Sequence, residues 1–229
     1  MHASPQVLNQ IVELAKNHKV IAIGEMHGVK ENPEVIYEIY TALKDKYSVV
    51  LGFEYLQSLI DDSDSADQVL YQDGRFSPFH KDLLEKLKQD DVKMFGFDLT
   101  NDQLETQKAE AIDWRDKIMA ENINKQIVKL SPDEKILLIT GDMHYQTKTQ
   151  SVVYPDKDGV MKPCEYLPMG AQFKTNSILA IHLRYLSGQF YNFKLRQMPK
   201  IDADKNRSFR DSDDLVEIDI REATPTTTL

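Results

Sequence analysis

Two segments of the sequence place an acid and a histidine at the same spacing after an apolar run. "IAIGEMHG" (residues 21–28) and "LITGDMHY" (residues 138–145) both break at a glycine into an acid, a methionine and a histidine. An imidazole gains or loses a proton near neutral pH, and a neighbouring carboxylate fixes which ring nitrogen carries that proton. His27 and His144, which share this setting, are therefore candidate functional residues.

The residues around these two segments predict alternating strands and helices. Four short apolar runs are typical of buried strands: "KVIAIG", "YSVVLGFE", "VKMFGFD" and "KILLITGD". Helices are predicted to begin at Ser4-Pro5, Asn32-Pro33 and Ser77-Pro78, because a polar cap followed by proline favours a helix start. The alternation predicts an α/β fold with a central, mostly parallel sheet flanked by helices on both faces.

Acidic or imidazole side chains follow each of the four predicted strands. They are Glu25 and His27, Glu54, Asp98, and Asp142 and His144. In open parallel sheets, ligands bind outside the carboxyl ends of the strands, because the strand-to-helix loops gather there. We therefore expect all six groups to converge on one edge of the sheet.

A buried cation is predicted on a long helix between about Asp102 and Leu130. At 100° per residue, apolar residues gather within about 80° of Arg115: Ala111, Ile112, Ile118, Met119, Ile123 and Ile127. An uncompensated buried charge is costly, so the strand-end carboxylates are the expected partners of Arg115. Asn122 lies on the same line of the helix, which indicates that this part of it faces a polar cavity.

The last third of the chain has a different pattern. "SILAIHLRYLSGQFYNFKLRQ" alternates apolar and polar residues on either side of Ser187-Gly188, which predicts an antiparallel hairpin at the C-terminal edge of the sheet. We assign residues 1–200 to a single α/β domain. Residues 201–229 are expected to form a charged loop, an edge strand at "LVEIDI" and a flexible tail at "TPTTTL".

Composition limits the partners. A net charge of −9 and a pI of about 5.2 argue against nucleic acid, which requires a basic surface. The sequence has no apolar run long enough for a membrane span, and the single cysteine, Cys164, cannot form an internal disulfide. These features favour a small-molecule partner and a cytoplasmic protein, or a secreted or lipid-anchored one if a leader has been removed.

Six segments together resemble the erythromycin-esterase-like and ChaN/Tiki-like superfamily. They are "IAIGEMHG", "VVLGFEY", "MFGFDL", "DWRDKIMAENI", "ILLITGDMHY" and "YLPMGAQFK", which span residues 20 to about 175 in the expected order. The resemblance implies a central sheet flanked by helices, and activities that include metal-independent ester hydrolysis, metal-dependent proteolysis and haem binding. The esterase members have a longer spacer in the first motif and large helical lid insertions, both of which this chain lacks.

The leading hypothesis is a hydrolase of esters or related acyl bonds that activates water and requires no cofactor. The sequence has no G-x-S-x-G elbow for a covalent nucleophile. His27 would be the general base, oriented by Glu25 or Glu54, while Arg115 and His144 would stabilise charge on the carbonyl oxygen. The candidate substrate-binding residues are Asp98, Asn122, Asp142 and Tyr145.

Two alternatives remain open at this point. Glu25, His27, Glu54 and His144 could instead hold a divalent metal, since nitrogen and oxygen ligands suit zinc, manganese or iron. The same crevice, or a face paired across a homodimer, could hold haem with His144 or a tyrosine as axial ligand.

Overall fold

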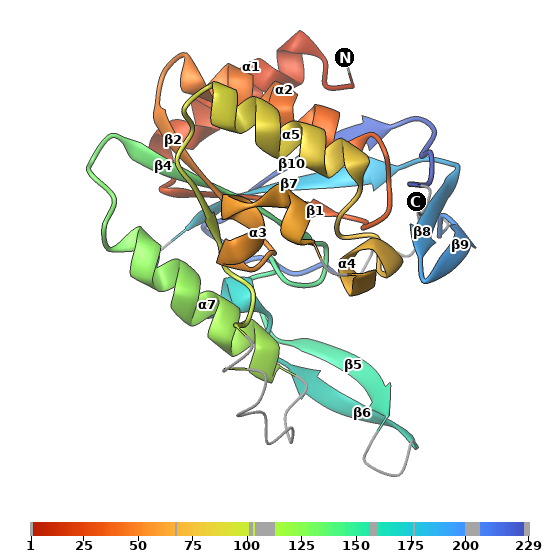
Figure 1. Cartoon of the computed structure of the whole chain (residues 1–229). Helices are drawn as coiled ribbons and strands as arrows, with labels where there is room; N and C mark the ends of the chain where they lie inside the picture. The colour runs from red at the N-terminus through yellow and green to blue at the C-terminus, as the bar shows by residue number, and fades with distance from the viewer. Residues whose placement is uncertain are drawn as a thin grey trace.

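The computed structural model of the chain describes residues 2–66, 68–100, 103, 113–155, 160–175, 177–199 and 207–226. Within this part, six strands form one sheet in the order β10-β7-β1-β4-β2-β3, and every neighbouring pair is parallel (Figure 1). The strands are β1 (Val20–Glu25), β2 (Ser48–Phe53), β3 (Met94–Gly96), β4 (Glu134–Gly141), β7 (Ile178–Tyr185) and β10 (Asp214–Ile220). The predicted α/β fold is confirmed.

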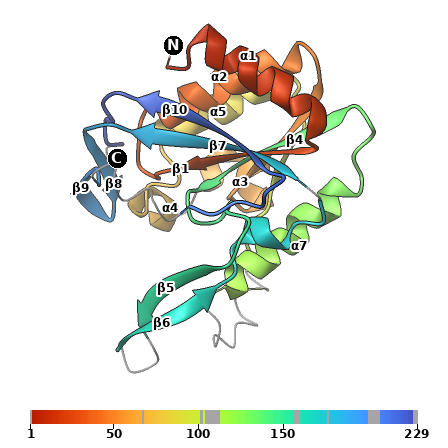
Figure 2. The ribbon, with the colours of Figure 1, turned by 180° about the vertical axis from the view of Figure 1, so that it is seen from behind.

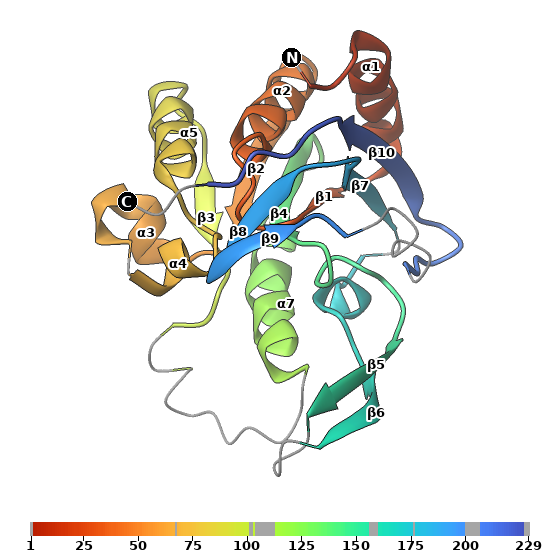
Figure 3. The ribbon, with the colours of Figure 1, turned by 90° about the vertical axis from the view of Figure 1, so that its right-hand side faces the viewer.

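Helices cover both faces of this sheet. The helices are α1 (Pro5–Leu14), α2 (Asn32–Lys44), α3 (Gln57–Asp61), α4 (Gln68–Gln72), α5 (Pro78–Gln89) and α7 (Trp114–Ile127). Figure 3 shows α1, α2 and α5 on one face and α7 on the other. The long helix predicted from Asp102 is thus described from Trp114 onward, and Asp102, Ala111 and Ile112 lie outside the described residues.

The helix starts follow the capping prediction at two of three places. Ser4 accepts a hydrogen bond from the Val7 N–H and Ser77 accepts one from the His80 N–H, which satisfies donors that the first turn leaves free. Asn32 is different, because α2 already includes it. Its side chain donates to the carbonyl of Met26 instead, so it fastens the helix to the loop that follows β1.

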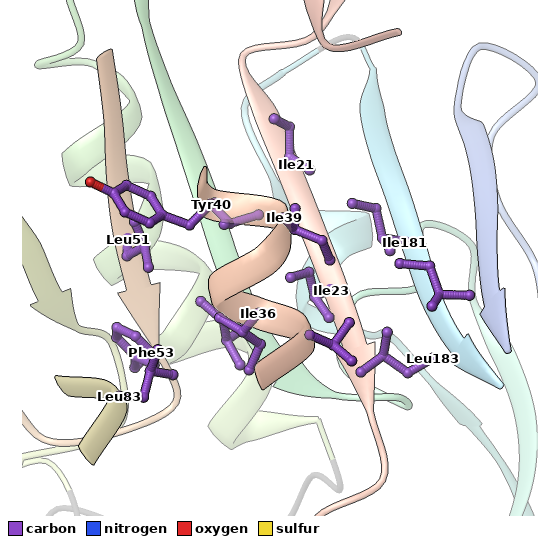
Figure 4. Close-up of a cluster of buried hydrophobic side chains, with 14 of the residues drawn as sticks. Ile21, Ile23, Ile36, Ile39, Tyr40, Leu51, Phe53, Leu83, Ile181 and Leu183 are labelled. Carbon is purple, nitrogen blue, oxygen red and sulfur yellow. The ribbon is translucent and has the colours of Figure 1, made fainter. Parts of the chain in front are cut away.

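Alternate residues of the strands build two separate cores. Ile21 and Ile23 of β1 face α2 and α5, together with Leu51, Phe53 and Ile181 of neighbouring strands (Figure 4). Their neighbours in β1, on the opposite face of the strand, pack with Met119 and Ile123 of α7. Full burial of one such side chain contributes about 1.5–3 kcal/mol, so both faces hold the sheet in place.

The predicted antiparallel hairpin is present in the C-terminal region, but it does not turn at Ser187-Gly188. β7 is a strand of the central sheet and pairs in parallel with both β1 and β10. The antiparallel pair comes one element later, between β8 (Gln189–Asn192) and β9 (Lys194–Gln197). β7 is buried along almost its whole length, which is typical of an inner parallel strand.

The final segment is an edge strand followed by ordered contacts. β10 contains the predicted "LVEIDI" strand and lies at the edge of the sheet beside β7, as Figure 2 shows from behind. Thr224 and Thr226, at the start of the predicted flexible tail, bond to the loop after β1: the Thr224 carbonyl accepts from the Lys30 N–H, and the Thr226 N–H donates to the Gly28 carbonyl. Residues 201–206 and 227–229 lie outside the described residues.

A two-stranded arm extends from the body beside α7. β5 (Gln150–Pro155) and β6 (Met161–Tyr166) pair in antiparallel fashion and project below the sheet (Figures 1 and 2). The arm follows directly after "LITGDMHY" and leads back to the sheet through a short 3₁₀ helix, η3 (Met169–Gln172). Within the described residues, no helix has the length and apolar character needed to cross a membrane.

Candidate functional site

The two Gly-acid-Met-His segments lie side by side because β1 and β4 are neighbours. Glu25 stands opposite Gly141 in the parallel register, and the Asp142 N–H donates to the Glu25 carbonyl. The two histidines then flank Gly141. A methyl group at Gly141 would lie 2.9 Å from His27 Nε2 and 3.3 Å from the His144 Cδ2 atom, so only glycine leaves both rings where they are.

His27 is bonded to a buried carboxyl group through one ring nitrogen. Its Nδ1 atom lies 3.1 Å from Glu25 Oε1, while its Nε2 atom lies 3.9 Å from Glu54 Oε2. Burial raises the pKa of Glu25 above its ordinary value of 4.5, although His27 opposes this effect. The Nδ1 contact fixes the ring and directs Nε2 towards Glu54.

Glu54 is a fully bonded carboxylate at the centre of the site. Its Oε1 atom accepts from Arg115 at 2.7 Å, and its Oε2 atom accepts from the Thr140 hydroxyl and the Gly141 N–H, both at 2.9 Å. Burial alone would raise its pKa, but the charges of Arg115 and the two histidines hold the pKa well below 4.5. Glu54 is therefore an anion that remains charged.

His144 mirrors the arrangement of His27. Its Nδ1 atom lies 2.9 Å from Asp116 Oδ1, and its Nε2 atom lies 3.8 Å from Glu54 Oε1. Burial lowers the pKa of His144, but Glu54 and Asp116 outweigh it and place the pKa above the ordinary 6.5. His144 thus keeps its proton to a higher pH than a free imidazole does.

Two arginines complete the cluster. Arg115 donates from Nε to Asp98 Oδ1 at 3.0 Å and from Nη2 to Asp98 Oδ2 at 2.9 Å, in addition to its bond with Glu54. The strand-end carboxylates are therefore its partners, as expected from its place on the helix. Arg75 donates from Nη1 to Asp98 at 2.7 Å and also pairs with Asp73.

Three candidate substrate-binding residues point elsewhere. Asp142 turns away from the two histidines and pairs with His182 at 3.0 Å and Arg207 at 3.1 Å. Asn122 donates to the carbonyl of Phe97 at 3.2 Å. Tyr145 is fully buried, and a methyl group at Gly24 would strike its ring. Of the four, Asp98 alone joins the cluster, through the arginines.

Sequence reasoning missed Arg75, Asp116 and Tyr166. Arg75 sits in a loop between α4 and α5, where no periodic pattern marks it. Asp116 follows Arg115 directly, and one residue of helix turns its side chain by about 100°, which brings it under His144 rather than Glu54. Tyr166 begins "YLPMGAQFK", so the resemblance marks the segment, but the spacing of its residues does not distinguish this tyrosine.

The four candidate metal ligands do not form a common donor set. Both oxygens of Glu54 are already bonded, and Glu25 lies at the Nδ1 atom of His27, away from the Nε2 atoms. Across the part of the chain that the structure describes, no group of three or more His, Cys, Asp or Glu residues is placed to hold a metal ion. A haem group needs fewer protein ligands than a metal ion does, because one imidazole can supply its axial ligand. The Nε2 atom of His144, with Nδ1 held by a carboxylate, meets that requirement.

Comparison with known proteins gives the following similarities. No family model matches the chain, and no curated protein matches it. Among solved structures, it is similar to RRSP, a MARTX toxin effector domain from Vibrio vulnificus, with a TM-score of 0.49 and 19% identity. That match covers 90% of this chain and 39% of the toxin chain, so this chain spans well under half of that structure.

Two further structures have similar scores. ChaN of Campylobacter jejuni, described with cofacial haem binding, has a TM-score of 0.48 and 14% identity over 86% of this chain and 93% of its own. The type III effector HopBA1 has a TM-score of 0.46 and 12% identity over 93% and 94% of the two chains. Identities this low do not transfer an activity, and the erythromycin-esterase part of the sequence resemblance stays a prediction.

Proposed function

We propose that this protein is a hydrolase that adds water to the carbonyl group of a small-molecule ester or lactone, without a covalent intermediate. The observation that carries the proposal is the paired arrangement of His27 and His144. Each ring is bonded through Nδ1 to a buried carboxyl group, and each directs Nε2 towards the same anion, Glu54. Both rings are 19% exposed, whereas Glu54 is 3% exposed, so a substrate can reach the imidazoles but not the central anion.

His27 is the general base of the proposed reaction. A water molecule attacks the carbonyl carbon, and its proton passes to His27 Nε2 as the new carbon–oxygen bond forms. The contact between Nδ1 and Glu25 stabilises the positive charge that the ring gains. A positioned base of this kind contributes about 10²–10⁴ in rate.

His144 and Arg115 stabilise the oxygen that becomes negative. Burial lowers the pKa of His144, but Glu54 and Asp116 outweigh it and raise the pKa above 6.5, which favours the protonated ring that this role requires. Arg115 is 32% exposed and is held by Glu54 and Asp98, so its charge is fixed at the edge of the site. When the tetrahedral intermediate collapses, the bond to the leaving oxygen breaks, and that oxygen takes the proton held by His27.

The test compares His27→Ala and His144→Ala with the unaltered protein on a panel of esters and lactones. We expect each substitution to lower turnover by roughly 10²–10⁴, while the melting temperature stays nearly constant. His2→Ala is the matched control, because His2 contacts Glu34 near the surface, away from the cluster. Acid release followed at constant pH measures the rate, with and without a chelator.

Unchanged turnover in His27→Ala would contradict the assigned base. Unfolding of that variant would show instead that the residue is structural. Loss of activity in the chelator, restored by one divalent metal, would contradict the metal-free reaction and favour the metal-dependent alternative.

Haem binding is the second candidate, favoured by the arrangement of His144 alone. Its Nε2 atom is directed away from the carboxylate that holds Nδ1, as in histidines that bind iron. A titration of the purified protein with haem, followed at the Soret band, tests this candidate. Saturable binding that weakens in His144→Ala, together with no turnover of any ester, would replace the hydrolase proposal.

A further inference from the structure

The segment from Tyr166 to Gly170 wraps around His144 and its carboxylate partner. The Tyr166 hydroxyl donates to Asp116 Oδ2 at 2.6 Å, and the Met169 N–H donates to the same oxygen at 2.8 Å. The Gly170 N–H donates to the backbone carbonyl of His144 at 2.9 Å. This segment therefore contacts both the side chain that orients His144 and the backbone that carries it.

Both oxygens of Asp116 contact His144 Nδ1, but only Oδ2 has further partners. Oδ2 receives Tyr166 and Met169, which leaves Oδ1 as the shorter contact of His144 Nδ1, at 2.9 Å. Without these two donors, the carboxylate could rotate about its Cβ–Cγ bond, because aspartate side chains adopt a broad range of this torsion angle. With Oδ2 clamped from two sides, the position of Oδ1 and the plane of the imidazole are fixed together.

The Tyr166 hydroxyl also lies 3.2 Å from His144 Nδ1. His144 Nδ1 contacts both Asp116 oxygens, at 2.9 and 3.0 Å, and the bond from Tyr166 to Oδ2 restrains the carboxylate that holds the ring. Tyr166 is 5% exposed, and burial together with Asp116 raises its pKa, so the phenol remains a donor.

We propose that Tyr166 is a positioning residue for His144 and acts through Asp116. Tyr166 is the last residue of β6, so the root of the β5–β6 arm belongs to the framework of the site. The proposed catalytic consequence rests on the hydrolase function, whereas the orientation of the ring does not. The experiment separates the two.

The test is Tyr166→Phe, which removes one oxygen and keeps the ring. Tyr47→Phe is the matched control, because it also removes a part-buried tyrosine hydroxyl, one that donates to the carbonyl of Val12 far from the site. ¹⁵N nuclear magnetic resonance of the histidine side chains reports the tautomer and hydrogen bonding of His144. We expect a single Nδ1-bonded form in the unaltered protein and in Tyr47→Phe, and an exchange-broadened or shifted signal in Tyr166→Phe.

The second readout is turnover of the best ester found for the protein. We expect kcat to fall roughly tenfold to hundredfold in Tyr166→Phe with little change in KM, since a small misplacement of a catalytic group slows the reaction more than it weakens binding. Unchanged His144 signals would overturn the proposal, whatever the activity. Loss of the folded state in Tyr166→Phe would also overturn it, because the hydroxyl would then support the fold rather than the ring.

A protein that turns over no ester gives a different result. The hydrolase proposal would then fail, while the resonance signals of His144 would still decide the role of Tyr166.

Discussion

The two histidines have the same contacts but different electrostatic surroundings. Glu54 and Asp116 flank His144 and, against the effect of burial, raise its pKa. His27 is bonded to Glu25, whose own pKa is raised by burial. A carboxyl group whose pKa is raised holds a positive charge on its neighbour less strongly than a carboxylate whose pKa is lowered, as that of Glu54 is. This difference supports the assignment of His27 as base and His144 as electrostatic partner.

Glu54→Gln tests the central anion. We expect a loss of stability on the order of 1–3 kcal/mol at neutral pH, because Arg115, Thr140 and Gly141 lose a charged acceptor. The pKa of Glu54 is lowered in the folded state, so its contribution is present above about pH 4.5 and is lost as the pH falls through the lower folded value.

Denaturant unfolding of both proteins between pH 7 and pH 2 measures this difference. The stability gap should be largest at neutral pH and should shrink in acid. A gap that stays constant with pH, or grows in acid, would show that Glu54 does not owe its role to its charge.

At the scale of residues, the sequence predicted which side chains stand at the strand ends better than it predicted which residues they contact. Glu25, His27, Glu54 and His144 are placed by strand register, which an apolar run followed by a polar group reveals. Asp142 has the same kind of position but turns to His182 and Arg207, because the loop after β4 contacts β7 and the segment from Arg207. Such contacts depend on loop conformation, which a local pattern does not encode.

At the scale of elements, the site depends on the close approach of β1 and β4. Gly141 is the last residue of β4 and lies between the two imidazoles, so the end of this strand borders the site. Glycine is needed there for space. Its N–H also donates to Glu54, so the strand end contributes one donor to the central anion.

Gly141→Ala is predicted to lower turnover strongly while the fold persists. The added methyl group would lie 2.9 Å from His27 Nε2, closer than carbon and nitrogen atoms pack, and the end of a side chain yields more easily than a strand. We expect His27 to rotate away from Glu25. Activity, thermal melting and the histidine resonances measure the effect; full activity would show that the rings are not confined as observed.

The inner strand β7 was harder to predict than its neighbours at the centre of the sheet. β1, β2 and β4 are apolar runs with one consistent interpretation, whereas β7 contains His182 and Arg184 and looked like half of an exposed hairpin. In the structure, His182 is buried beside Asp142, and Arg184 pairs with Glu217 and Asp219 of β10. The polar residues of β7 are thus satisfied by partners distant in sequence, and alternation alone misrepresented the strand as amphipathic.

At the scale of the whole molecule, a segment near the C-terminus secures the loop that carries His144. Arg207 pairs with Asp142, and the Thr147 hydroxyl donates to Asp213, while the Thr147 N–H donates to Ser208. The segment from Arg207 to Asp213 therefore connects β10 with the loop after β4. Residues far apart in the sequence are thus joined by one network of hydrogen bonds and an ion pair.

Arg207→Ala is predicted to loosen that loop. We expect amide hydrogen exchange to rise in residues 142–150 and to stay unchanged in α1 and α2, which lie on the opposite face of the sheet. Arg196→Ala is a suitable control, because Arg196 donates only to the nearby Asn192 carbonyl among the contacts described for it. Equal exchange rates in the two variants would contradict the network.

The order of strands in the sheet has a consequence for how the chain is made. β1 emerges early from the ribosome, yet Val20 pairs with Ile136 and Ile178, which are synthesised much later. Until β4 and β7 appear, β1 has no strand beside it, and its apolar side chains rely on α1 and α2 for cover. Pairing over such separations is intrinsically slow, and unpaired apolar strands attract other chains. Nascent chains that stall before β7 should therefore be the form of this protein that depends most on chaperones.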